Sequence, residues 1–146
     1  MVLSILLLLR RASQPNVAEL GRVRESSEFA SITDDQPRTR VPGVLAARVD
    51  GALLYFNAER ARDRLLELVA AQREGISVAI VFLGTVPTID LAGADMLIEL
   101  RHALAARGIE VRFAGPHSRV RDALVRAGLD PAVVHAFRTV ADALPH

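Results

Sequence analysis

The side chains that could carry chemistry do not form a catalytic or metal-binding pattern in this sequence. Asp95 and Glu99 are four residues apart, like a pair of carboxylates, but the hydrophobic pattern places both on the solvent face of a helix. Ser118 has no neighbouring base and no glycine pattern for an oxyanion site, so we expect it at the start of a helix. The histidines lack metal-ligand spacing: His102, His117, His135 and His146. We therefore predict no catalytic residue, no metal site and no cofactor.

Composition narrows the classes of function further. A chain of 146 residues with 51% hydrophobic residues can bury one core, which predicts a single domain. The net charge of +1 argues against a nucleic-acid partner, because phosphate binding needs clustered positive charge. The absence of cysteine excludes disulfides, thiolate catalysis and cysteine-based zinc sites.

The position best suited to binding is a predicted helix start at Asp90. The apolar run VAIVFL (78–83) lacks alternation and predicts a central strand, and a loop from Gly84 to Ile89 leads from it to the helix. Free backbone N–H groups and the positive end of the dipole gather at such a start, which suits an anion. Gly93 in the first turn allows a ligand or another backbone to come close. Alternatively, Asp90 is only a helix cap and Gly93 only a packing glycine.

Upstream of this helix the pattern predicts a hairpin followed by another helix. VLAARV (44–49) and LLYF (53–56) flank Asp50-Gly51, a dipeptide typical of tight antiparallel turns. Asn57 is then expected to cap a helix that runs to about Arg73.

Downstream, strands and helices are expected to alternate. The helix from Asp90 has one apolar face, made of Gly93, Met96, Leu97, Leu100 and Leu104. The later elements are expected to be a strand at 111–114, a helix ending at Ala127-Gly128, an edge strand at 133–137 and a last helix at 139–144. Strands joined through helices lie parallel. The sequence thus predicts an α/β fold, a mixed sheet of four to five strands (an N-terminal hairpin, then parallel strands) packed against about four helices.

The N-terminus carries a short apolar segment. Residues 2–9 read VLSILLLL, and Arg10 and Arg11 follow directly. Such a helix rises only about 13–14 Å, less than half of a hydrocarbon core of about 30 Å. Positive charge after the apolar run is typical of the cytoplasmic end of a membrane helix. We expect residues 1–11 to be the last turns of a membrane helix or, alternatively, a short helix packed on the domain or on a partner.

Two further segments complete the expected organisation. Residues 12–42 are rich in Ser, Arg, Asp and Pro without sustained periodicity, which predicts a linker. Residues 43–146 are expected to form the folded domain. The arginines of its third helix, Arg119, Arg121 and Arg126, can contact acidic lipid headgroups or loops of a membrane protein, or form a solvated face.

Four motifs in order resemble the STAS domain family, whose members are bacterial anti-sigma-factor antagonists and tails of SulP anion transporters. TVPTIDLAGADMLIELRHAL (85–104) resembles the central signature, and AGP (114–116) with RAGL (126–129) resembles the next one. LLYFNAERAR (53–62) and RASQPNVAELGRV (11–23) resemble the SulP branch in particular. The resemblance covers nearly the whole chain and implies a STAS-like fold.

The resemblance also implies a site at the loop and helix start. Its residues, which would bind an anion or a partner, are Thr85, Thr88, Asp90, Ala92 and Gly93, with Asn57 at the hairpin-to-helix junction. In antagonists a serine at this site is phosphorylated, but here Ala92 stands in its position and has no hydroxyl. Phe82 stands where the family has an acidic residue, and Gly84 where it has a small polar one. We therefore predict no phosphorylation switch.

Taken together, the resemblance implies a cytosolic, non-catalytic regulatory domain of a secondary anion transporter of the sulfate type, on the cytoplasmic face of the inner membrane. Its expected partner is the membrane part of the same transporter. Another regulatory protein and a homodimer formed through the transporter are further partners that the resemblance allows. The alternatives are a soluble anti-sigma-factor antagonist and a weak nucleotide-binding module, although the chain lacks a glycine-lysine phosphate loop.

Overall fold

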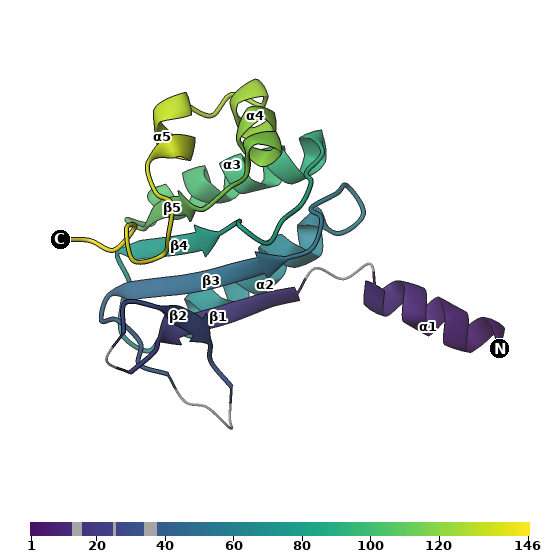
Figure 1. Cartoon of the computed structure of the whole chain (residues 1–146), viewed down its shortest axis with the longest axis horizontal. Coiled ribbons are helices and arrows are strands. Elements are labelled where there is room, and N and C mark those ends of the chain that lie inside the picture. Colours follow the sequence, from purple (N-terminus) through teal and green to yellow (C-terminus); the bar gives the residue numbers. More distant parts are fainter. Residues whose placement is uncertain (13–15, 25, 34–37) are drawn as a thin grey trace.

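A five-stranded mixed sheet forms the centre of the molecule (Figure 1). The computed structural model describes residues 1–12, 16–24, 26–33 and 38–146. The strands in chain order are β1 (Asn16–Arg22), β2 (Phe29–Ser31), β3 (Val44–Asp50), β4 (Val78–Phe82) and β5 (Glu110–Ala114). They lie in the order β2-β1-β3-β4-β5, with β1 antiparallel to β2 and β3, and with β3, β4 and β5 parallel. The predicted α/β fold with a mixed sheet is confirmed.

The described residues also contain five helices. They are α1 (Val2–Ala12), α2 (Ala58–Ala70), α3 (Leu91–Ala105), α4 (Ser118–Arg126) and α5 (Pro131–His135). Side chains of α2 to α5 pack with alternate residues of β1, β3, β4 and β5 in one hydrophobic core. The other residues of these strands pack against the C-terminal segment, which contributes Val140 and Ala143 to a second, smaller core. Both faces of β4 are therefore covered, as its unbroken apolar run predicted.

The predicted hairpin between 44–49 and 53–56 is wrong. β3 pairs instead with β1, in a register that runs from Asn16↔Asp50 to Leu20↔Ala46. Gly51, at φ +92°, turns the chain away from β3, and its N–H donates to the carbonyl oxygen of Thr85 at 3.2 Å. The segment 53–56 then contributes one isolated bridge and no strand, because its backbone bonds to the loop that precedes α3.

The prediction that residues 12–42 form only a linker is also wrong, because β1 and β2 lie within it. β1 forms five residue pairs with β3 and buries Val17 and Leu20, so the sheet begins at residue 16 and not at residue 43. The missed signal is weak, since only these two side chains of the strand NVAELGR are large, apolar and buried. Residues 13–15, 25 and 34–37 of this segment lie outside the described residues.

Two predictions near the C-terminus are corrected as well. Residues 131–135 form the short helix α5 and not an edge strand, because Pro131 starts it and Asp130 caps it by accepting from the Ala132 N–H at 2.8 Å. Of residues 133–137, only Phe137 forms a β-bridge, an isolated one to Ala114. Residues 139–144 form turns and not a helix, and Pro145 directly afterwards cannot continue one.

α1 stands apart from the sheet in Figure 1, on the side where β1 begins and β3 ends. Its large apolar side chains are exposed: Val2, Leu3, Ile5, Leu6, Leu7, Leu8 and Leu9. Among the described residues, every helix is too short or too polar to cross a membrane.

Candidate functional site

Two segments far apart in the sequence meet at the carboxyl ends of β3 and β4. They are the turn at 51–57 and the loop at 83–90 that leads into α3. The Leu53 N–H donates to the Thr88 carbonyl at 3.1 Å, and the Asp90 N–H donates to the Leu53 carbonyl at 3.1 Å. The predicted loop and helix start thus share one edge of the sheet with the turn before α2.

Asp90 connects the two segments through its side chain. One carboxylate oxygen accepts from the Gly93 N–H at 2.9 Å, which makes Asp90 the cap of α3. The other accepts from the Tyr55 N–H at 2.8 Å. The carboxylate therefore already places negative charge at the positive end of α3, so a second anion there would be repelled. This electrostatic arrangement disfavours anion binding at the α3 start.

Gly93 lies where the two segments come closest. A Cβ atom at this position would lie 2.5 Å from the Leu53 carbonyl oxygen and 2.7 Å from Cγ1 of Ile89. Only a glycine leaves room for the turn to pass over the first turn of α3. Of the two roles expected for this residue, the close approach of another backbone is the one that the structure describes.

Asn57 does not cap α2 through its side chain, contrary to the prediction. Its side chain turns back instead: Oδ1 accepts from the Leu54 N–H at 2.9 Å and Nδ2 donates to the Ala52 carbonyl at 2.8 Å. The residue is only 5% exposed. Asn57 thus holds the turn at 52–57 in shape, because its amide satisfies backbone groups that the turn leaves without strand partners.

The remaining predicted site residues offer few free polar groups. The Thr85 hydroxyl donates to the Val49 carbonyl at 2.8 Å, so it is already used by the fold. Thr88 is exposed and lies one residue before Ile89, which bridges to Leu53. Ala92 is half-buried in the first turn of α3. The structure places these residues in the loop before α3 and in its first turn.

Phe82, at the end of β4, packs against the two loops that follow β4 and β5. A Cβ atom on Gly84 would clash with its ring, and one on Gly115 would lie 2.5 Å from the ring edge. The sequence identified Phe82 and Gly84 as departures from the family pattern, but not that they fit each other. An aromatic ring and a glycine together fill this position.

Three exposed apolar side chains form a patch that the sequence analysis missed. Tyr55 is 78% exposed, Phe56 50% and Leu91 67%, and the two rings stand edge to face at 5.5 Å. The hydrogen bond from Tyr55 N–H to Asp90 sets the turn beside the start of α3, where Leu91 lies. We call Tyr55, Phe56 and Leu91 the aromatic patch. Reading 53–56 as a strand hid it, although large apolar residues directly before a helix were a usable signal.

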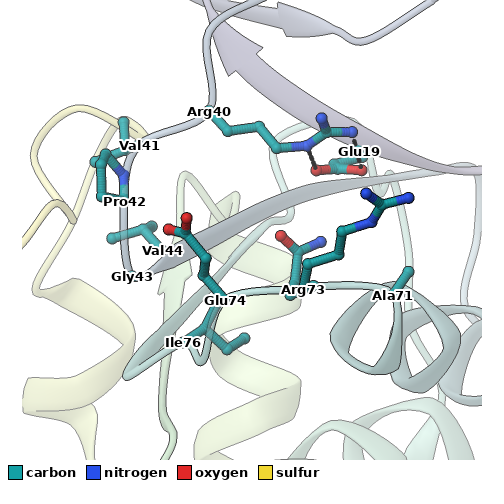
Figure 2. Close-up of a pocket in the computed structure, with 11 residues that line it drawn as sticks. Glu19, Arg40, Val41, Pro42, Gly43, Val44, Ala71, Arg73, Glu74 and Ile76 are labelled. Atoms are coloured by element: carbon teal, nitrogen blue, oxygen red, sulfur yellow. Dashed lines mark hydrogen bonds and ion pairs between the residues drawn. The ribbon is translucent and has the colours of Figure 1, made fainter.

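A cleft at the opposite edge of the sheet has balanced charge. It has a volume of about 530 Å³ and lies beside Gly43 and Ile76, near the starts of β3 and β4. Figure 2 shows Arg40 paired with Glu19, while Arg73 and Glu74 extend into the same space. The Arg40–Glu19 pair is bidentate, at 2.7 and 3.3 Å, and this hydrogen bonding raises the pKa of Arg40. Two arginines and two glutamates in the lining leave no net charge to attract an ion.

The described part of the chain contains no cluster of three His, Asp or Glu side chains placed to hold a metal ion. Asp95 and Glu99 are exposed on α3, on the solvent face that the sequence assigned to them. Ser118 is the first residue of α4, also as expected.

Comparison with known proteins connects this architecture to a family. The family model described as "STAS domain" matches residues 37–143. The chain belongs to the STAS domain family. This STAS domain is 33% identical over 144 residues to the "Probable sulfate transporter Rv1739c" of Mycobacterium tuberculosis, covering 97% of the chain and 26% of that protein. It is 29% identical to "Sulfate transporter 1.3" of Arabidopsis thaliana, covering 94% of the chain and 22% of that protein. The chain thus spans about a quarter of the length of these relatives.

Solved structures support the fold over different lengths. A STAS domain of a SulP transporter from Vibrio cholerae is 26% identical, with a TM-score of 0.58, over 73% of this chain and 82% of that one. The structure of SLC26A9 has a TM-score of 0.82 over 97% of this chain and 25% of that one, at 16% identity. The second match shows the fold alone. Because it covers 97% of this chain, the matched region includes most of α1 and all of β1.

Proposed function

We propose that this STAS domain is the cytosolic, non-catalytic regulatory domain of a secondary anion transporter of the sulfate type. It would act at the cytoplasmic face of the inner membrane, in contact with the membrane part of the same protein. The curated relatives that are named sulfate transporters support this, since the chain aligns with them over 94–97% of its own length. A homodimer would then form through the transporter.

The observation that carries the proposal is the place where α1 joins the domain. β1 begins at Asn16, which pairs with Asp50, and Asp50 is followed by the turn that bears the aromatic patch. The exposed apolar helix α1 therefore joins the sheet at the same edge as the patch and the loop at 83–90 (Figure 1). If α1 continues from a membrane helix, that edge faces the membrane.

The aromatic patch supplies the contact surface for the membrane part. Exposed aromatic side chains contribute large apolar area and are over-represented in the centres of protein interfaces. The patch is also rigid, because Asp90, Gly93 and Asn57 fix the backbone on which it stands. A rigid patch loses little conformational entropy on binding. Movement of the membrane part would be transmitted through this contact.

We expect no phosphorylation at the position where antagonists have their serine. Ala92 has no hydroxyl, and the Thr85 hydroxyl is bonded to the backbone of β3. A soluble antagonist and a nucleotide-binding module are both left without a specific observation in their favour. Phosphate found on Thr85 or Thr88 by mass spectrometry of protein from cells, with an effect on transport, would contradict this part.

Fractionation of cells that express the native gene tests the assignment. Antibody raised against residues 43–146 should detect the protein in the membrane fraction, and an alkaline carbonate wash should not release it. Protease added to inside-out vesicles should remove the domain, whereas protease added to intact spheroplasts should not. A protein recovered in the soluble fraction would refute the assignment.

A further inference from the structure

A second cavity of about 720 Å³ lies at the carboxyl end of β5, between the start of α4 and the end of α5. Its polar lining comes from His117, Ser118, Arg121, His135 and Arg138. We propose that this cavity binds a phosphate or sulfate group. The inference goes beyond the proposed transporter role and does not depend on it.

The lining of the cavity has a single sign of charge. Arg121 and Arg138 both face it, and no acidic residue is among the side chains that line it. Within the described part of the chain, neither arginine forms an ion pair. Concave surfaces lined by one sign of charge concentrate the opposite ion. The cleft of Figure 2 differs in this respect, because its lining includes two glutamates as well as two arginines.

Arg121 is positioned in advance for such a group. It is half-buried, and its Nη1 donates to the Pro116 carbonyl at 3.3 Å, which leaves the other guanidinium N–H groups unassigned. An arginine fork held in place can bind two oxygens of a phosphate or sulfate at once. Arg138 is exposed and lines the same cavity, so it can supply a second positive charge to the group.

The start of α4 adds to this charge, in contrast to the start of α3. Asp90 fills the first turn of α3 with a carboxylate, whereas the cap residue of α4, His117, makes no side-chain hydrogen bond to the helix. Its first-turn N–H groups therefore have no carboxylate partner and border the cavity at Ser118. Of the two neighbouring loop-to-helix junctions, the one after β5 is the cationic one.

His117 connects the cavity to the loop after β4. Its Nε2 lies 2.8 Å from the Gly84 carbonyl oxygen, and because a carbonyl only accepts, Nε2 carries the proton. Gly84 begins the loop that leads to Asp90 and the aromatic patch. A bound oxyanion would thus touch a residue that holds this loop.

The cavity is large enough for a group bigger than a bare ion. Its volume lies within the range of about 300–1,000 Å³ that small-molecule sites occupy. Val134 and Phe137 add apolar surface beside the arginines. The group can be a free oxyanion or the phosphorylated headgroup of a membrane lipid, and both have the same chemistry at the arginines.

Calorimetric titration of the chain 1–146 tests the proposal. The probes in the titration are sodium sulfate and inorganic phosphate, at constant ionic strength. A separate flotation assay uses phosphatidylcholine vesicles with or without phosphatidylinositol 4-phosphate. The variants are Arg138→Gln and Arg121→Gln, and the control is Arg119→Gln, an exposed arginine of α4 that does not line the cavity. Any adsorption of α1 to the vesicles is the same in the unsubstituted chain and the three variants, so it cancels in the comparison.

We expect saturable binding at one site per chain, weakened at least tenfold by either cavity variant and unchanged by Arg119→Gln. Binding of the free ions identifies a soluble oxyanion, and the same pattern only with phosphoinositide vesicles identifies a lipid headgroup. No binding of any probe, or equal loss in the control, overturns the proposal. Thermal unfolding checks each variant, and if Arg121→Gln is unfolded, the exposed Arg138→Gln alone decides.

Discussion

At the scale of single residues, the edge that carries the aromatic patch depends on contacts to backbone and not on reactive groups. Asp90 caps α3 and holds Tyr55, while Gly93 leaves room for the Leu53 carbonyl. The helix cap and the close approach at the glycine were both expected from the sequence, because aspartate is a preferred capping residue and a glycine lets another backbone come close. The role of Asn57 could not be predicted from the sequence, since its partners are backbone groups of a turn that exists only in the folded chain.

Gly93→Ala should destabilise the domain. The added Cβ would lie 2.5 Å from the Leu53 carbonyl oxygen, so the turn at 51–57 or α3 must move. We expect the free energy of unfolding in urea to fall by about 1–3 kcal/mol, as for overpacked cores. Gly75→Ala is the matched control, because nothing lies within 4 Å of its Cβ position and its φ is not positive. It should change stability by less than about 0.5 kcal/mol. Equal effects at both positions would contradict the close approach at Gly93.

At the scale of elements, the sequence located β3, β4, α3, β5 and α4 well, because each combines an apolar run or a hydrophobic period with a glycine or capping residue near one end. It failed where an element depends on its neighbours. β1 is a strand because β3 offers it an edge, and the segment after α5 is held to the sheet by Arg112. Local patterns do not contain such information.

Arg112 should be a main tether of the C-terminal segment. It donates to the Ala143 carbonyl at 2.8 Å, lies 5.5 Å from the ring centre of Phe137 and pairs with Glu110. Arg112→Ala should lower the free energy of unfolding by about 2 kcal/mol, from the lost hydrogen bond and ring contact. It should also speed hydrogen exchange in residues 137–144. Arg107→Ala, an exposed arginine just after α3, is the control. Unchanged exchange in the Arg112 variant would refute the tether.

The Arg112–Glu110 pair predicts that the free energy of unfolding depends on pH. The hydrogen bond from Arg112 lowers the pKa of Glu110 below its ordinary value of 4.5. A lowered folded-state pKa means that the stabilisation is present above pH 4.5 and is lost as the pH falls through the folded-state pKa. The stability difference between the native chain and Glu110→Gln should therefore shrink under acid, and the Arg112→Ala background should abolish this trend. Urea titrations across this range measure it, and a difference that grows under acid would contradict the pairing.

At the scale of the whole molecule, the family model and the folded unit do not begin at the same residue. The model matches residues 37–143, whereas the sheet begins at Asn16. Sequence alone gave the class of fold and the family resemblance, because the signatures lie in local segments. It did not give this boundary, because β1 contributes only Val17 and Leu20 to the core as large apolar residues.

Two shortened chains separate α1 from β1. A chain that starts at residue 13 should keep its circular dichroism and cooperative unfolding and become more soluble, because the large apolar side chains that it loses are exposed. A chain that starts at residue 38 lacks the strand that forms five pairs with β3, and it should lose cooperative unfolding. If the shorter chain unfolds as cooperatively as the longer one, β1 is not an integral part of the domain.

The proposed orientation of the domain can be measured most directly by fluorescence quenching in the native protein in membranes of cells that express its gene. Residues 1–146 contain no cysteine, so Tyr55→Cys and Glu74→Cys each add one labelling site to this domain, on the aromatic patch and at the opposite edge, and the unsubstituted protein gives the background labelling. A dye at position 55 should be shielded from a water-soluble quencher, and a dye at position 74 should be quenched freely. Equal quenching at both positions would contradict a domain whose aromatic edge faces the membrane part of a transporter.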